Sequence, residues 1–203
     1  MQALWNAKFQ GDSFIYGEDP NAFILENEAL LLPCKCILCL GEGEGRNALY
    51  LAEKGMTVEA MDASDVGLFK LRASAKARYV EVKLRHTILA YWNPTPSYGA
   101  VVCTYLHVPK NEQKVLFEKA LSALEEGGIF IAELFSESQK SFHSGGPKEL
   151  DLLYNINTIT ETIKSLPCAI LKLSQEIVVL NEGEKHQGRA SVIRVILKKK
   201  ALA

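Results

Sequence analysis

Three glycines at alternate positions follow an apolar run and lead directly into an amphipathic segment: Gly41, Gly43 and Gly45. Because glycine has no Cβ, such a turn brings backbone N–H groups and a helix N-terminus up against a ligand. A carboxylate, Asp62, ends the next apolar run, where it can accept hydrogen bonds from both hydroxyls of a ribose. This spacing predicts a binding site for a nucleotide-like molecule.

Some of these residues have a second interpretation. The dinucleotide fingerprint Gly-x-Gly-x-x-Gly needs glycine at position 46, where this chain has Arg46, so a nicotinamide oxidoreductase is the least favoured reading. Asp62 could instead cap a helix that begins near Ser64. Arg46 could meet a carboxylate or lie over the surface of its own helix, and the sequence leaves both open.

Two histidines are candidates for binding a substrate or removing its proton, because imidazole changes charge near neutral pH. His107 follows the apolar run 99–104, and His186 lies in a turn-rich stretch near Arg189. The alternative for each is a hydrogen-bonded structural residue. His107 and His186 are therefore the candidate catalytic residues.

Three of the five cysteines lie close enough together to suggest a metal site: Cys34, Cys36 and Cys39. The last two fall in an expected strand, where residues three apart point to opposite faces. We therefore expect reduced thiols and no metal.

The hydrophobic pattern predicts strands that alternate with helices. Strands are expected at 36–40, 57–61, 82–86, 99–104 and 128–135, with helices at 46–54, 65–77 and 112–125. Strands that are apolar throughout are typical of sheets covered on both faces, so the pattern predicts an α/β doubly wound parallel sheet. Ligands of such sheets bind beyond the carboxyl ends of the strands, where the glycine turn, Asp62, residues 87–89 and residues 104–107 all emerge.

The last third of the chain follows a different pattern. A helix is expected at 157–165, followed by strands at 169–180 and 189–198. The turn-rich stretch 181–184 joins these two strands, so they should form an antiparallel hairpin.

Composition agrees with one compact cytoplasmic domain. The chain has 203 residues, 48% of them hydrophobic, and a net charge of −1, which leaves no electrostatic footprint for a nucleic acid. The lysines at 198–200 are expected at a solvated strand end. No apolar run reaches the ~18 residues of a membrane span. We expect a single domain over 1–203, with an N-terminal cap segment at 1–33 and the core at 34–203.

Several motifs in order resemble bacterial class I S-adenosylmethionine-dependent methyltransferases, in the branch related to tellurite-resistance and thiopurine methyltransferases. The first is Gly-Glu-Gly-Glu-Gly-Arg-Asn-Ala at 41–48. The others are Tyr-Gly-Glu-Asp-Pro-Asn-Ala-Phe at 16–23, Met-Asp-Ala-Ser at 61–64 with 66–68 and Lys70, 147–154, and His-Gln-Gly-Arg-Ala at 186–190. The resemblance spans nearly the whole chain.

The resemblance implies a Rossmann-like fold with a seven-stranded sheet, mostly parallel, whose final strand is antiparallel. It implies S-adenosylmethionine as cofactor, S-adenosylhomocysteine as product, and a cap segment that helps to enclose them. The residues expected to contact the methionine part are Gly41, Glu42 and Gly43. Asp62 would bind the ribose, and the adenine would meet Ala63, Ser64 and Leu89. Cys103, Thr104 and Tyr105 would border the sulfonium, with Tyr16 and Arg46 also near the cofactor.

The chain departs from the wider family pattern at two positions. Cys39 stands where many members carry an acid two residues before the first glycine, so Glu42 is the candidate to supply that charge. Ile88 stands where an aspartate commonly meets the adenine amino group, which removes one hydrogen bond of about 0.5–1.5 kcal/mol. We expect weaker or differently arranged cofactor binding.

The expected reaction is methyl transfer to a small-molecule acceptor, such as a thiol or a chalcogen oxyanion like tellurite. The alternative is a noncatalytic module that binds S-adenosylmethionine or S-adenosylhomocysteine in a degenerate site. No nucleic-acid or membrane partner is expected. The acceptor and the oligomeric state do not follow from the sequence.

Overall fold

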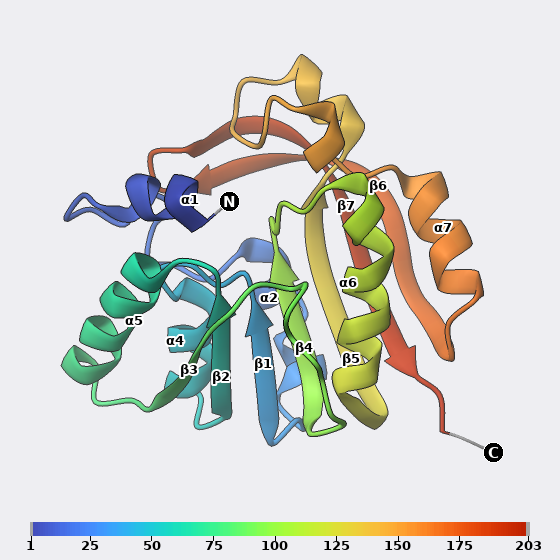
Figure 1. Ribbon diagram of the computed structural model, residues 1–203, viewed down its shortest axis with the longest axis horizontal. Coiled ribbons are helices and arrows are strands. Elements are labelled where there is room, and N and C mark those ends of the chain that lie inside the picture. Colours follow the sequence, from blue (N-terminus) through green and yellow to red (C-terminus); the bar gives the residue numbers. More distant parts are fainter. Residues whose placement is uncertain (1, 202–203) are drawn as a thin grey trace.

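The computed structural model describes residues 2–201; Met1 and residues 202 and 203, at the ends of the expected domain, lie outside the described part. A seven-stranded sheet with the order β3-β2-β1-β4-β5-β7-β6 forms its centre (Figure 1). The strands are β1 (Cys36–Leu40), β2 (Thr57–Asp62), β3 (Val82–His86), β4 (Tyr98–Thr104), β5 (Leu124–Phe135), β6 (Cys168–Glu182) and β7 (His186–Lys199).

The pairing of these strands confirms the predicted fold class. The first five strands pair in parallel, whereas β7 pairs antiparallel with both β5 and β6. The order reverses between β1 and β4, which is where ligands bind in doubly wound sheets.

The helices are α1 (Gln2–Phe9), α2 (Ala22–Glu26), α3 (Glu28–Leu31), α4 (Arg46–Glu53), α5 (Asp65–Ala77), α6 (Lys110–Ala123) and α7 (Ile156–Lys164). Two short 3₁₀ turns, η1 (Glu137–Ser141) and η2 (Leu150–Leu152), follow β5. Within residues 2–201, no helix is long and apolar enough to cross a membrane.

Helices cover both faces of the sheet, because residues along each strand alternate between two hydrophobic cores. In β1, Ile37 and Cys39 pack in one core with residues of α2, α4 and α5. Leu38 and Leu40 pack in the other core with residues of α6 and α7. Cys36 packs against this second core, so the expectation that Cys36 and Cys39 point to opposite faces is confirmed.

The element boundaries differ from the predicted ones mainly near β5 and the hairpin. β5 begins at Leu124 rather than 128, because Leu124 already pairs with Tyr98 of β4 across a register shift. The predicted helix 112–125 therefore ends at Ala123. The turn between β6 and β7 is shorter than predicted, and His186 is the first residue of β7 and pairs with Glu182.

The N-terminal segment lies across the carboxyl ends of the parallel strands, next to the tip of the β6–β7 hairpin (Figure 1). The backbone N–H of Lys185, in the tip, donates to the carbonyl of Ile15 at 3.2 Å. Asn6 of α1 hydrogen-bonds Asp65 and Ser64 at the start of α5. Two segments that are far apart in sequence thus enclose the edge of the sheet where the predicted site lies.

Candidate active site

A cavity of about 230 Å³ opens at the carboxyl edge of the sheet. Most of the expected site residues line it: Tyr16, Gly41, Glu42, Gly43, Arg46, Asp62, Ala63, Leu89, Thr104, Tyr105, His107 and His186. Two expected cofactor contacts do not. Ser64 is fully buried and bonded within the protein, and Cys103 is a fully buried core residue.

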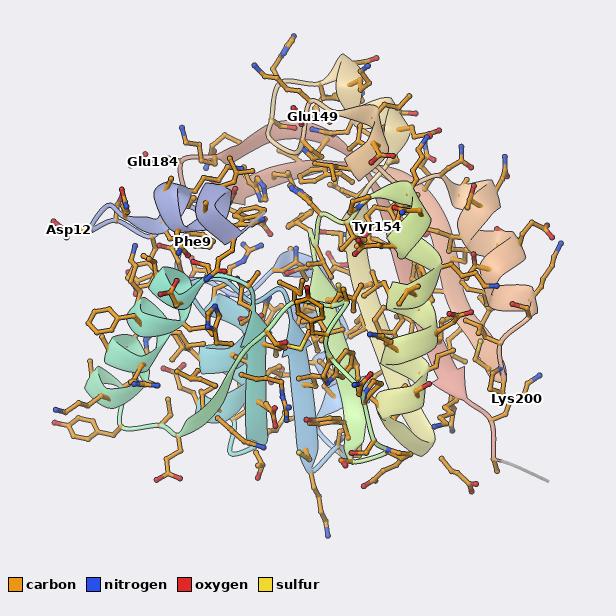
Figure 2. The ribbon with its side chains drawn as sticks, in the orientation of Figure 1. Phe9, Asp12, Glu149, Tyr154, Glu184 and Lys200 are labelled. Carbon is orange, nitrogen blue, oxygen red and sulfur yellow. The ribbon has the colours of Figure 1, made fainter. Side chains whose placement is uncertain are left out.

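The glycine turn has the backbone conformation that its sequence predicts. Gly41, Gly43 and Gly45 have φ angles of 63°, 61° and 100°, in the left-handed region that other residues rarely adopt. A Cβ on Gly43 would lie 2.9 Å from the ring of Phe9, which Figure 2 shows beneath α1, facing the sheet. The absence of a side chain at Gly43 therefore lets α1 pack directly on the turn.

Four N–H groups of the turn donate to acceptors of the protein, although the sequence predicts that they face a ligand. Those of Gly41 and Glu42 donate to the carbonyl of Met61, and that of Gly45 donates to Glu42. The Gly43 N–H donates to Asp62 Oδ2 at 2.8 Å. A ligand here would meet the glycine Cα atoms and carbonyl groups rather than a nest of donors.

Asp62 ties the glycine turn to the end of β2. Its second oxygen, Oδ1, accepts from the Ser64 N–H at 2.7 Å. Burial raises the pKa of this carboxyl, and the two N–H bonds oppose that rise. The alternative that Asp62 caps the following helix is wrong, because Ser64 caps α5 by accepting from the Gly67 N–H.

Glu42 occupies the N-terminus of α4. Its Oε1 accepts from the Ala48 N–H at 2.7 Å, and Asn47 Nδ2 approaches Oε2 at 3.4 Å. Burial raises the pKa of the Glu42 carboxyl to about 7, against the effect of these donors and of Arg46. The positive end of the α4 dipole is thus already matched by a carboxyl group of the protein.

Arg46 meets a carboxylate, as the first of its two interpretations has it, and this carboxylate belongs to the protein. Its Nη2 lies 3.0 Å from Glu182 Oε2 at the end of β6, and its Nη1 donates to the Tyr16 carbonyl at 3.2 Å. The two side chains are 8% and 10% exposed. Glu182 falls in the expected turn 181–184, and no local signal distinguishes it, since it lies 136 residues from Arg46.

The loop after β3 forms another wall of the cavity. Lys119 of α6 donates to the carbonyls of Leu89 and Trp92 at 2.7 and 2.6 Å, which fixes this loop. Ile88 lines the cavity and is partly exposed, so the apolar side chain at this position forms part of the cavity wall.

Six rings from four parts of the chain meet at the other end of the cavity; we call them the aromatic cluster: Trp5, Tyr16, Tyr105, His107, Phe135 and His186. The His186 ring lies 4.5 Å from Tyr16, 4.6 Å from Tyr105 and 5.3 Å from Phe135, centroid to centroid. The His107 ring lies 5.4 Å from Trp5. Tyr105 has a φ of 52°, and such strained residues concentrate at functional sites.

The two candidate histidines have different surroundings. His107 Nε2 is buried and has no hydrogen-bond partner among the described residues. Burial, together with nearby Lys8 and His186, lowers the pKa of His107 to about 3. His186 Nδ1 instead lies 3.2 Å from Glu182 Oε2. Burial lowers the pKa of His186, and the Glu182 carboxylate opposes that effect.

Part of the cavity lies in a segment that is similar to a known protein family. Residues 37–128 match the methyltransferase domain family. This range contains the glycine turn, Asp62, the loop after β3 and His107, whereas the N-terminal segment and the hairpin lie outside it. No curated protein sequence matches the chain significantly.

Solved structures of methyltransferases share the fold over almost the whole chain. TehB from Haemophilus influenzae has a TM-score of 0.72 at 15% identity, over 98% of this chain and 67% of its own. An S-adenosylmethionine-dependent methyltransferase from Clostridium acetobutylicum has a TM-score of 0.68 at 15% identity, over 98% and 97%. Magnesium protoporphyrin IX methyltransferase from Synechocystis, with bound S-adenosylhomocysteine, has 0.70 at 13%, over 98% of both chains.

At these identities the likeness establishes the fold, which is the α/β methyltransferase fold with its antiparallel final strands. The expected cofactor is consistent with the S-adenosylhomocysteine bound to a neighbour of the same fold.

Proposed function

We propose that the protein transfers a methyl group from S-adenosylmethionine to a small acceptor. The observation that carries this proposal is the position of Glu42 at the N-terminus of α4. A dinucleotide would place its pyrophosphate at this helix end, where the Ala48 N–H is already bonded to the Glu42 carboxyl group. A cofactor with adenosine but without phosphate meets no such conflict. The methyltransferase domain match over 37–128 supports the same conclusion.

The residues of the glycine turn and β2 fit adenosine and methionine groups. Each Asp62 oxygen accepts one N–H bond, and a carboxylate oxygen has a further lone pair for a ribose hydroxyl. Ala63, Ile88 and Leu89 would border the adenine. Glu42, with its raised pKa, would face the methionine part together with Gly41.

The bound cofactor would supply an electrophilic methyl group, so the protein mainly has to orient the acceptor and exclude water. The aromatic cluster is suited to both tasks because its rings are large, rigid and apolar. An acceptor that arrives protonated also needs a base, and His107 and His186 are the candidates. The acceptor we favour is a thiol or a chalcogen oxyanion, on the resemblance to tellurite-resistance and thiopurine methyltransferases.

Calorimetry with S-adenosylhomocysteine tests the cofactor assignment. Asp62→Ala should weaken binding by about 1.5–3 kcal/mol, because hydrogen bonds from hydroxyls to a carboxylate are charge-assisted. Glu81→Ala, a change at an exposed carboxylate that does not line the cavity, should leave the affinity unchanged. Equal affinity of the wild type and Asp62→Ala would contradict the contact between Asp62 and the ribose. Tighter binding of NAD than of S-adenosylhomocysteine would favour a nicotinamide oxidoreductase instead.

A turnover assay separates the enzyme from a noncatalytic binding module. Wild-type protein would be incubated with S-adenosylmethionine and a panel of thiols, tellurite and selenite, and S-adenosylhomocysteine release measured. We expect release with at least one acceptor. Cofactor binding without release for every acceptor in the panel would favour the module.

A further inference from the structure

Glu182 connects the glycine turn to a histidine of the aromatic cluster. Both carboxylate oxygens are occupied: Oε1 accepts from Asn21 Nδ2 at 3.0 Å, and Oε2 accepts from Arg46 at 3.0 Å and lies 3.2 Å from His186 Nδ1. The Glu182, Arg46 and His186 side chains are at most 10% exposed. Arg46 directly follows Gly45, so the three side chains run from the glycine turn to the far end of the cavity.

This arrangement selects one form of the neutral His186 ring. An ionised carboxylate only accepts hydrogen bonds, so the ring nitrogen next to Glu182 must carry its proton. Burial disfavours the ionised form of Glu182, but the bonds from His186 and Arg46 prevail and hold the pKa of the carboxyl below its usual value. The proton therefore lies on Nδ1, and Nε2 keeps its lone pair.

Packing fixes the direction of the same ring. His186 lies between Tyr16 and Tyr105, with Phe135 on a third side. Nε2 makes no hydrogen bond to any residue within 2–201, and the ring lines the cavity. The His186 ring is thus held in the cavity wall by a carboxylate and three rings, and its Cδ2–Nε2 edge lies next to Gly145, where only a glycine leaves room.

We propose that Glu182 and Arg46 are positioning residues that make His186 the general base and couple it to the glycine turn. The proposal rests on the proposed function and names the base for it. As the acceptor heteroatom bonds to the methyl carbon, the carbon–sulfur bond breaks and leaves its electron pair on sulfur. The acceptor's proton goes to Nε2, and Glu182 stabilises the resulting imidazolium.

His107 does not fit this role. It has no carboxylate partner, and its nearest titratable neighbours, Lys8 and His186, both disfavour a positive charge on the ring. His107 is therefore a neutral wall of the chamber, whose unpartnered Nε2 can hydrogen-bond the acceptor. Two histidines of one cavity thus have separate tasks.

The titration of His186 can be followed directly by NMR, because the chain has only four histidines. Charged or titratable groups reach His186 from every side: Glu182 and Glu133 raise its pKa, Arg46 lowers it, and Tyr16, Tyr105 and His107 complete the surroundings. In ¹⁵N spectra of the wild type we expect the Nδ1–H tautomer. Glu182→Gln should lower the His186 midpoint, and Arg46→Gln should raise it.

The matched control is Glu184→Gln, which removes an exposed carboxylate two residues away at the outer end of the same hairpin (Figure 2). It should leave the His186 midpoint unchanged. Arg46→Lys keeps the positive charge, so its His186 midpoint should stay closer to that of the wild type than the midpoint of Arg46→Gln. An Nε2–H tautomer in the wild type, or an unchanged midpoint in Glu182→Gln, would overturn the proposal.

Activity supplies the second readout. At pH 7, His186→Gln should lower kcat by about 10²-fold or more and Glu182→Gln by about tenfold, with little change in calorimetric cofactor affinity. The acidic limb of the Glu182→Gln pH profile should move in the same direction as the NMR midpoint. A uniform fall in kcat with no such movement would mean a purely structural role. Absence of cofactor binding in the wild type would instead reject the proposed function, whatever the NMR result.

Discussion

The two ends of the cavity are stabilised in different ways. Around the glycine turn, the Glu42 and Asp62 carboxyl groups bind backbone N–H groups within residues 42–64: Glu42 binds Ala48, and Asp62 binds Ser64 and Gly43. Buried Glu44 is the exception, because it binds the Ile15 N–H and Lys70. At the aromatic cluster, contacts join distant segments, such as Arg46 to Glu182 and Asn21 to Glu182. We call the first end locally specified, because the Glu42 and Asp62 contacts lie within residues 42–64, whereas the second end forms only when β6, β7 and the N-terminal segment are all in place.

The largest effect should come from a change at the locally specified end. Gly45 has a φ of 100°, and a Cβ there would lie 2.2 Å from Leu71 Cδ1. Gly45→Ala combines a strained backbone with overpacking, so it should lower the free energy of unfolding by about 4 kcal/mol. Urea denaturation measures this loss.

Gly55 offers the matched control for that change. Its φ is 85°, but a Cβ there would have no atom within 4 Å. Gly55→Ala should therefore lower the free energy of unfolding only by the cost of backbone strain, about 2 kcal/mol. Equal losses in the two variants would mean that Leu71 yields freely and that the turn is less tightly specified than its geometry indicates.

A pH dependence sharpens the comparison, because Glu42 is buried at the locally specified end. Its pKa is raised from 4.5 to about 7, so the folded state holds the proton more tightly than the unfolded state. The free energy of unfolding that Glu42 contributes is therefore greatest below pH 4.5 and declines as the pH rises through about 7. The expected loss between pH 5 and 8 is about 2–3 kcal/mol.

Glu42→Gln removes this ionisation while its amide oxygen can still accept from Ala48. The stability of the variant relative to wild type should therefore rise between pH 5 and 8 by the same amount. Glu81→Gln, at an exposed position, should show no such change. Parallel wild-type and Glu42→Gln stability curves would mean that Glu42 ionises in the folded protein as easily as in the unfolded chain.

The same comparison explains which features could be predicted from the sequence. The glycine turn, Asp62 and the alternating faces of β1 follow from nearby residues, because backbone conformation and strand periodicity are local. The parallel order and the antiparallel hairpin follow from the element pattern and the family resemblance. The domain match over 37–128 covers the glycine turn, Asp62 and most of β1, but not the hairpin.

The less predictable features depend on contacts across the sheet. Glu182 acquires its role only when β6 brings it to Arg46, and no spacing in the chain anticipates that pair. Ser64 and Cys103 lie in segments that border the cavity, as predicted. Their side chains do not line it, because Ser64 caps α5 and Cys103 packs in the hydrophobic core. Sequence motifs thus place backbone segments correctly, whereas side-chain direction depends on the complete fold.

The smallest effect is expected at His107, whose ring should not change charge in the physiological range. With a pKa lowered to about 3, its NMR signals should stay constant from pH 5 to 8, and His107→Gln identifies those signals. The pH profile of kcat/KM in this variant should keep the wild-type shape, because a neutral hydrogen-bonding wall contributes no titration. A His107 midpoint near 6.5 would show that water reaches Nε2. The aromatic cluster would then be a hydrated crevice rather than a closed chamber.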